Sequence, residues 1–250
     1  MIDGLKPYDS KKRKEVLKKI GVVFGQRTQL WWDLPLLETY YLLKDIYEVS
    51  DEDFNERFTY LRKTLELEKF IQSPVRTLSL GQRMRADLAA SLIHNPEILF
   101  LDEPTIGLDV LVKEHIIKAI KEINEKYNTT VILTTHDMND IISLCNRVII
   151  IDEGKILFDG HIDEVKNRFG NIKNIFLSSN NFVADKLLSI YPEILIDNEN
   201  NNIKIEFDAD KTNINDLMKT IFDCGDIKDI SIKENDLSNV VKQIYENKAF

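Results

Sequence analysis

The sequence predicts an α/β fold with a mostly parallel sheet and a helical subdomain, followed by a small ferredoxin-like α+β domain. Two observations support this prediction. From residue 19 to residue 160, short apolar runs typical of buried strands alternate with amphipathic stretches typical of helices. Near residue 170 the chain becomes richer in Asn and Asp, and the expected order of elements becomes βαββαβ.

The first expected strand covers residues 19–24, a short apolar and β-branched run. Residues 35–71 are expected to be helical, because apolar residues recur there at helical spacing. Ser50 and Asp53 stand in capping-box positions within that stretch. We therefore expect a helical subdomain at about residues 34–77.

The rest of the first domain continues the alternation, and we place this domain at residues 1–168. The run EILFLD is almost continuously apolar, as in a strand covered on both faces. Ligands of such sheets bind at the carboxyl ends of the strands. The further expected elements are a helix at 82–94, the EILFLD strand at 97–102, a helix at 112–127, a strand at 129–135, a helix at 138–146 and strands at 147–152 and 156–160.

The second expected domain covers residues 171–250 and shows no catalytic constellation. We expect it to be a packing or regulatory accessory. Its expected elements are strands at 174–178, 193–197, 203–207 and 227–233, helices at 182–191 and 214–225, and a last helix at 236–247.

Composition and charge narrow the function classes. A formal net charge of -9 argues against a general nucleic-acid surface, which needs a basic excess. No apolar run reaches the roughly 18 to 20 residues that a membrane span needs, and the first twenty residues lack a secretory signal. We expect a soluble, cytoplasmic chain with two reduced cysteines, Cys145 and Cys224. The basic run at 11–14 is either a solvated helix face or a localisation patch.

An acidic pair follows the EILFLD strand. Asp102 and Glu103 stand at its carboxyl end, and Pro104 ends the pattern of backbone hydrogen bonds between strands. One carboxylate can hold Mg²⁺ while the other orients or deprotonates an attacking water. A solvated acidic turn is the alternative.

The segment LSLGQ precedes the helix expected from about Gln82. Gly81 lets the backbone approach a ligand closely, and the backbone N–H groups of a helix start can face an anion. The alternative is an ordinary helix start with Ser79 as the N-cap residue.

Further polar side chains follow neighbouring strands. His136 is placed to contact a terminal phosphate or to position water, whereas His94, His115 and His161 lack such a context. Gln26 follows the first strand, with Gln29 as a rival for the same role. The adjacent Trp31 and Trp32 are either an exposed anchor for a partner or core packing.

The order and spacing of these motifs resemble the ATPase subunit of an ABC transporter over roughly residues 1–165. The segment FGQRTQLWWDLP, together with Leu80, is similar to ATPases that serve type-two exporters of drugs, antibiotics or polysaccharides. Most members of the family have glycine where Leu80 stands. Because Ser79 and Gly81 keep their places, we expect the contact made by this segment to survive.

The resemblance implies a role for each motif residue. Asp102 would help to hold Mg²⁺, with Gln26 sensing the ion and linking to the membrane partner. Glu103 would be the general base, and His136 would contact the γ-phosphate. Two ATPase subunits of this family enclose two ATP molecules. The residues implied to act between subunits are Ser79, Gly81 and Gln82, which would grip the ATP of the opposite subunit, and Asp109, which would bridge the subunits.

One motif of the family is missing from this chain. The phosphate loop, G-x-x-x-x-G-K-[ST], is expected upstream of Gln26, but none of the nine glycines forms that pattern. We therefore expect an N-terminally incomplete ATPase that binds ATP weakly and does not hydrolyse it alone. Strands beside the missing segment are expected to have uncovered edges.

The implied partners are a transmembrane exporter subunit, contacted through the region after Gln26 that includes Trp31 and Trp32, and a second ATPase subunit. The expected location is the inner face of the cell membrane. Two alternatives remain open at this point. The chain is either a non-catalytic subunit that offers only its LSLGQ face to a partner ATPase, or a soluble ABC-type protein that acts on nucleic acid or ribosomes. The acidic charge disfavours the last alternative.

Overall fold

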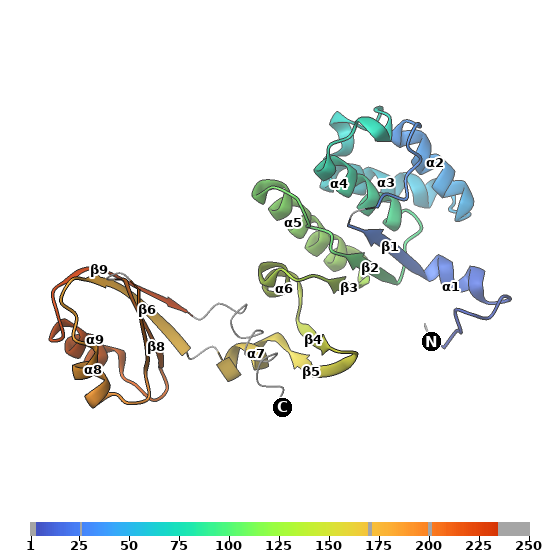
Figure 1. The fold of residues 1–250 in the computed structure, drawn as a ribbon. Helices are drawn as coiled ribbons and strands as arrows, with labels where there is room; N and C mark the ends of the chain where they lie inside the picture. The colour runs from blue at the N-terminus through green and yellow to red at the C-terminus, as the bar shows by residue number, and fades with distance from the viewer. Residues whose placement is uncertain (1–3, 26, 170–171, 200–201, 235–250) are drawn as a thin grey trace. The chain divides into compact units, whose positions relative to one another are not determined.

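The computed structural model describes residues 4–25, 27–169, 172–199 and 202–234 (Figure 1). The chain forms two compact units, Met1–Leu144 and Cys145–Phe250. The predicted α/β fold with a following α+β domain is confirmed. Among the described helices, none is long and apolar enough to cross a membrane.

A parallel three-stranded sheet forms the centre of the first unit. It consists of β1 (Ile20–Phe24), β2 (Ile98–Asp102) and β3 (Thr130–Thr134), in the order β1-β2-β3. In the register, Phe24 lies opposite Asp102, and Asp102 lies opposite Thr134. The carboxyl ends of all three strands therefore meet at one edge of the sheet.

The outer strand β3 is less well covered than its neighbours. Within the described residues it pairs with β2 alone, and Ile132 in its middle is 44% exposed. By contrast, Leu99 and Leu101 of β2 are each 1% exposed. That the strands beside a missing segment have uncovered edges stays a prediction.

Three helices accompany the sheet. Helix α1 (Arg13–Lys19) runs directly into β1 and was not predicted as an element, although the basic run at 11–14 overlaps its first two residues. Residues 11–14 are all exposed, which favours a solvated face, and Lys14 forms an ion pair with Glu48. Helix α5 (Val110–Tyr127) buries one isoleucine-rich stripe, and α6 (Met138–Leu144) follows β3.

The helical subdomain lies between β1 and β2 in the sequence (Figure 1). The helical region predicted at 35–71 contains two helices separated by Glu48, which has a left-handed φ of 58°. The second helix begins after Ser50, the N-cap residue that its capping-box position predicts. Tyr40, Leu61 and Leu88 are among its buried core residues. Its elements are α2 (Leu36–Ile46), α3 (Asp51–Thr64), the short 3-10 helices η1 (Leu67–Lys69) and η2 (Val75–Thr77), and α4 (Leu80–Leu92).

The second unit begins with a hairpin. Strands β4 (Arg147–Asp152) and β5 (Lys155–His161) pair antiparallel, and α7 (Ile162–Phe169) follows them. Ile150 and Val165 form their own small apolar cluster. The compact units divide before this hairpin, whereas the predicted domain boundary lies after it, at 168–171. That boundary stays a prediction.

The remainder of the second unit is the predicted βαββαβ arrangement. Its four strands form an antiparallel sheet in the order β7-β8-β6-β9, in which the first and third strands are central. Leu217 and Ile205 belong to its separate core. The elements are β6 (Ile172–Ser179), α8 (Ala184–Ile190), β7 (Leu195–Glu199), β8 (Asn202–Asp208), α9 (Ile214–Phe222) and β9 (Ile227–Glu234). The last helix, predicted at 236–247, falls outside the described residues.

Candidate functional site

The carboxyl edge of the parallel sheet brings three strand ends into backbone contact. The Gly25 N–H donates to the Asp102 carbonyl at 2.7 Å, and the Glu103 N–H donates to the Thr134 carbonyl at 3.0 Å. A Cβ added at Gly25 would lie 2.2 Å from the Glu103 carbonyl oxygen, so this approach requires glycine. The side chains that follow these strands are thus held near one another.

Asp102 is an exposed carboxylate that its neighbour strand orients. Thr134 Oγ1 donates to Asp102 Oδ1 at 2.6 Å. Within the described residues, Asp102 Oδ2 accepts no hydrogen bond from the protein. An ordered carboxylate with an oxygen open to solvent is the kind of ligand that Mg²⁺ prefers. Sequence reasoning missed Thr134, because the register that places it opposite Asp102, 32 residues away, is set by the fold.

Glu103 and His136 form a second pair at this edge. His136 Nδ1 lies 2.9 Å from Glu103 Oε1, and the histidine side chain is 74% exposed against 30% for the glutamate. The hydrogen bond to Glu103, together with its negative charge, raises the pKa of His136. Glu103 has a left-handed φ of 50°. An exposed carboxylate–imidazole pair of this kind can exchange a proton with a bound water.

A buried acid stabilises the segments that follow β2 and β3. Asp140 of α6 is fully buried and accepts hydrogen bonds from Thr105 and Thr135. Lys113 of α5 forms an ion pair with it, with Lys113 Nζ 2.8 Å from Asp140 Oδ1. The same lysine pairs with Asp137, directly after His136. This network holds the chain on both sides of the Glu103–His136 pair, and sequence reasoning did not find it.

The LSLGQ segment is a capped helix start. Ser79 Oγ accepts from the Gln82 N–H at 3.3 Å, and the Gln82 side chain accepts from the Ser79 N–H at 2.9 Å. The capping alternative therefore describes the local structure. Helix α4 begins at Leu80, two residues before the predicted start, because Ser79 is the N-cap. Leu80 itself is 41% exposed.

Two other predicted residues also have local structural partners. Gly81 is buried, and a Cβ there would lie 2.6 Å from Val112 Cγ1 of α5. Asp109 is the N-cap of α5, where Asp109 Oδ1 accepts from the Val112 N–H at 3.0 Å. In the described chain, no hydrogen bond or ion pair joins Ser79, Gly81 or Gln82 to Asp102, Glu103 or His136. The predicted residues therefore form two separate groups within the first unit.

The loop after β1 holds the other candidates. Gln26 lies outside the described residues. Its rival Gln29 is engaged within the protein, because its side-chain amide donates to the Val22 carbonyl at 3.2 Å. Trp31 and Trp32 are 40% and 48% exposed, which favours the anchor alternative over core packing. The guanidinium of Arg83 lies 4.8 Å from the ring centroid of Trp32.

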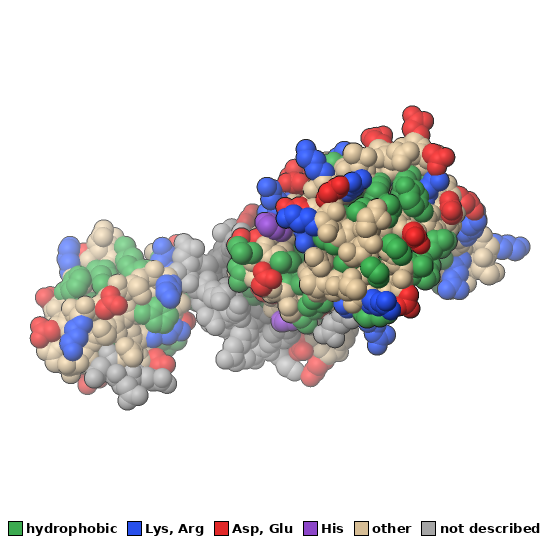
Figure 2. Space-filling model, turned by 90° about the horizontal axis from the view of Figure 1, so that it is seen from above, with side chains coloured by type: hydrophobic (Ala, Val, Ile, Leu, Met, Phe, Trp, Pro, Cys, Tyr) green, Lys and Arg blue, Asp and Glu red, His purple; other side chains and the backbone are tan. Residues whose placement is uncertain are grey.

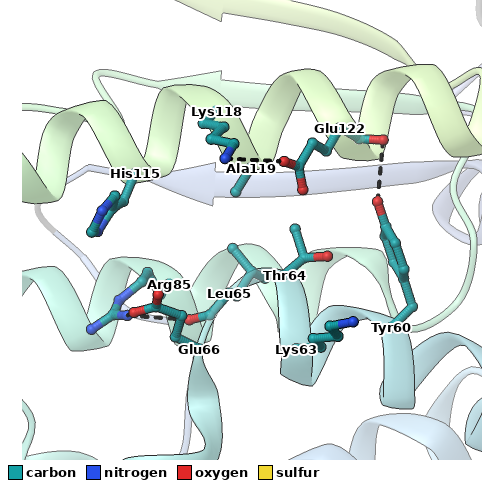
Figure 3. A pocket seen from close by; sticks show the side chains of 10 residues that line it. All are labelled: Tyr60, Lys63, Thr64, Leu65, Glu66, Arg85, His115, Lys118, Ala119 and Glu122. Atoms are coloured by element: carbon teal, nitrogen blue, oxygen red, sulfur yellow. Dashed lines mark hydrogen bonds and ion pairs between the residues drawn. The ribbon is translucent and has the colours of Figure 1, made fainter.

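Of the remaining histidines, His94 has a structural setting, and His161 Nδ1 accepts from the Asp163 N–H at 3.3 Å. His94 contacts the Ile20 carbonyl at 2.9 Å and stacks on Tyr47, and burial lowers its pKa to about 4. His115 lines a cavity of about 410 Å³ between α3, α4 and α5 (Figure 3). The ion pair Arg85–Glu66 joins α4 to the segment that follows the end of α3, and the ion pair Lys118–Glu122 lies along α5. This cavity contains none of the predicted site residues.

These residues fit a magnesium ion better than they fit ATP. Among the described residues, no three His, Cys, Asp or Glu side chains converge to form a metal site. Asp102 supplies one protein ligand, which suits Mg²⁺ because this ion keeps several of its waters. The 250 residues contain no glycine-rich loop with a lysine to cradle a triphosphate. On the face shown in Figure 2, acidic and basic side chains are interspersed.

Comparisons with known proteins agree with the geometry. The family model described as ABC transporter matches residues 2–106. The chain is 32% identical over 171 residues to the energy-coupling factor transporter ATP-binding protein EcfA2 of Clostridium tetani, covering 67% of this chain and 59% of that protein. It is 31% identical over 181 residues to the linearmycin resistance ATP-binding protein LnrL of Bacillus subtilis, covering 68% and 58%.

Solved structures of ATP-binding cassette proteins also resemble this chain. A dimeric ATP-binding cassette in a post-hydrolysis state, bound to ADP and Pi, aligns with a TM-score of 0.54 and 32% identity, over 64% of this chain and 69% of that one. The cbiO1 protein of Clostridium perfringens, part of the ABC transporter complex cbiONQ, aligns with a TM-score of 0.58 and 27% identity, over 64% of each chain. The chain spans less than two thirds of the length of both curated relatives.

Proposed function

Because the chain belongs to the ABC transporter family of ATP-binding proteins, we propose that it acts as an ATPase subunit of an ABC-type membrane exporter. The observation that carries the proposal is the Glu103–His136 pair beside Asp102 at the aligned strand ends. The similarity of the FGQRTQLWWDLP segment and of Leu80 to exporter ATPases supports the transport direction. Relatives with other named roles, such as methionine import, match at 32% identity.

The proposed chemistry uses the three side chains in different roles. Asp102, oriented by Thr134, holds Mg²⁺, which would neutralise charge on the phosphates when bound. Glu103 accepts a proton from the attacking water. His136 orients the Glu103 carboxylate through its Nδ1, which leaves the other ring nitrogen to contact the γ-phosphate. The raised pKa of His136 favours the protonated ring, whose charge suits that contact.

The second group acts between subunits in this proposal. Ser79, Gly81 and Gln82 contact the ATP held by an opposite subunit, and the N-terminal end of α4 favours an anion there. The capping box keeps this helix start ordered before any ligand arrives. Asp109, at the start of α5, bridges the two subunits.

The chain alone is proposed to bind Mg²⁺–ATP weakly and to hydrolyse none at a useful rate. Within its 250 residues there is no G-x-x-x-x-G-K-[ST] motif to offset the triphosphate charge. Calorimetric titration of the chain with a non-hydrolysable Mg²⁺–ATP analogue tests this. Binding in the micromolar range, or Mg²⁺-dependent turnover by the chain, would overturn it.

The partner-directed part of the proposal is tested in trans. We expect the chain to change the ATP turnover of a complete homologous ABC ATPase, because its LSLGQ face completes the partner's site. Ser79→Ala should weaken this effect. Ser50→Ala is the matched control, because Ser50 is also an N-cap serine but caps α3. Unchanged ATP turnover by the partner at a saturating concentration of the chain would contradict the proposed role. If Ser79→Ala and Ser50→Ala weakened the effect on the partner equally, the role of Ser79 would be contradicted.

A second candidate function is a non-catalytic subunit that regulates a partner ATPase. The exposure of Ser79 and Leu80 in the LSLGQ segment, combined with the absence of a phosphate-loop motif from these 250 residues, favours it. In both candidates Trp31 and Trp32 contact a transmembrane subunit, which places the chain on the inner face of the membrane. We propose residues 1–168 as the ATPase domain and 171–250 as an accessory domain.

A further inference from the structure

An acid buried in helix α4 has no role in the function proposed above. Asp87 is 4% exposed and stands in an apolar run with Ala86 and Leu88. Within the described residues it forms no ion pair. Burying a carboxylate in such surroundings is costly unless hydrogen bonds compensate for the lost water. Its hydrogen bonds therefore indicate what the residue does.

Within the described residues, all of these hydrogen bonds lead to the β1–α2 loop, here residues 27–35. Asp87 Oδ1 accepts from Thr28 Oγ1 at 3.0 Å and from the Gln29 N–H at 3.2 Å. Thr28 Oγ1 in turn accepts from the Leu30 N–H at 3.1 Å. One carboxylate oxygen thus orders three consecutive residues of the loop.

A second contact joins the same helix to the same loop. Arg83 stands one turn before Asp87 on α4, and its guanidinium lies over the Trp32 ring. Arg83 also donates to the Leu78 carbonyl at 3.3 Å, next to Ser79. The β1–α2 loop is therefore connected to both the middle and the first turn of α4.

We propose that Asp87 is a positioning residue that holds Thr28, Gln29 and Leu30 on α4, so that the β1–α2 loop and the LSLGQ helix start move as one body. The functional meaning rests on the proposed function. A force that a membrane partner exerts on Trp31 and Trp32 then reaches Ser79 along α4 through two attachment points.

The charges around Asp87 are compatible with this role. Arg83 faces it from α4 and Tyr40 faces it from α2. Burial raises the pKa of Asp87 to about 6, while the hydrogen bonds from Thr28 and Gln29 lower it. The carboxylate is therefore ionised at neutral pH, where it is the stronger acceptor.

Amide hydrogen exchange in the full chain tests the attachment. In Asp87→Ala, we expect exchange at the Gln29 and Leu30 amides to accelerate roughly tenfold or more, as for loss of a hydrogen bond to a charged group. Asp87→Asn keeps an acceptor oxygen and should stay close to wild type. Ser91→Ala is the matched control, because Ser91 is also a buried polar residue of α4 but bonds only to the Leu88 carbonyl.

Tryptophan fluorescence supplies an independent readout. The chain has two tryptophans, both in the β1–α2 loop. Asp87→Ala should increase quenching of their emission by acrylamide, and Ser91→Ala should not. Thr28→Val removes the donor from the loop side and should reproduce the effect if Asp87→Ala fails to fold. Unchanged loop exchange and quenching in Thr28→Val, with β2 amides still protected, would overturn the proposal.

The same samples separate this inference from the proposed function. If Asp87→Ala loosens the loop but the wild-type chain leaves a complete ATPase unaffected, the attachment stands and the proposed function fails. If the wild-type chain alters partner turnover and neither loop variant differs from wild type in exchange, the proposed function stands and the inference fails. If both hold, Asp87→Ala should reduce the effect on partner turnover while Asp87→Asn retains it.

Discussion

At the scale of single residues, the acid that anchors the loop also makes stability depend on pH. Burial raises the pKa of Asp87 to about 6, above the value of about 3.9 in an unfolded chain. Between these values the folded state binds more protons than the unfolded state, so the contribution of Asp87 to stability falls as pH rises from about 4 to 6. At neutral pH the raised pKa of Asp87 lowers the free energy of unfolding by roughly 3 kcal/mol.

Asp87→Asn should therefore be more stable than the wild type above pH 6, by up to roughly 3 kcal/mol, because the amide keeps an acceptor without the buried charge. The difference should shrink towards zero near pH 4, where the wild-type carboxyl is protonated. Urea unfolding of both proteins at pH 4.5 and 7.5 measures it. A difference that does not change with pH would contradict the assignment of the titration to Asp87.

Sequence reasoning at this scale found the residues at strand ends but not those that hold them. Asp102, Glu103 and His136 follow strands, and that position is visible in the sequence. Asp87 was not found, although an acid within an apolar helical stripe is a signal that can be searched for. Its partner Thr28 lies 59 residues away, so the pairing needs the fold.

At the scale of elements, α4 and α5 are packed against each other through a glycine. A Cβ at position 81 would lie 2.6 Å from Val112 Cγ1, which no side chain tolerates without movement. Gly81→Ala should therefore cost about 1–3 kcal/mol of unfolding free energy, as for overpacking. Val112→Ala should recover much of this loss, and the double-mutant cycle measures the coupling. Additive effects of the two substitutions would show that the clash is relieved elsewhere.

The sequence predicts most elements within a few residues, and the differences have local causes. The helical region at 35–71 divides at Glu48, which adopts a left-handed backbone, and the capping-box position of Ser50 already marks the start of the second helix. Helix α1 carries one buried residue, Val16, so its periodicity is weak. In the antiparallel order β7-β8-β6-β9, the pairing of β7 with β8 follows from the βαββαβ succession, since a turn links these two strands.

At the scale of the whole molecule, the βαββαβ part has a core of its own. Leu217 is fully buried among residues of α8, α9 and their sheet. Leu217→Ala should lower the stability of this part by about 2–5 kcal/mol. Amides in β6 and β8 should lose protection, while unfolding monitored by the two tryptophans, which lie in the first unit, should not shift. A parallel shift of the tryptophan signal would show that the two units unfold together.

The backbone of Glu103 has a consequence for protein engineering. A left-handed conformation costs a residue with a Cβ roughly 1 kcal/mol relative to glycine, so a screen for heat resistance should reward Gly at this position. The variant Glu103→Gly would lack the carboxylate that we propose as the proton acceptor. Attempts to stabilise this chain should therefore keep Glu103 unchanged, since heat resistance and the proposed role of the carboxylate favour different residues at this position.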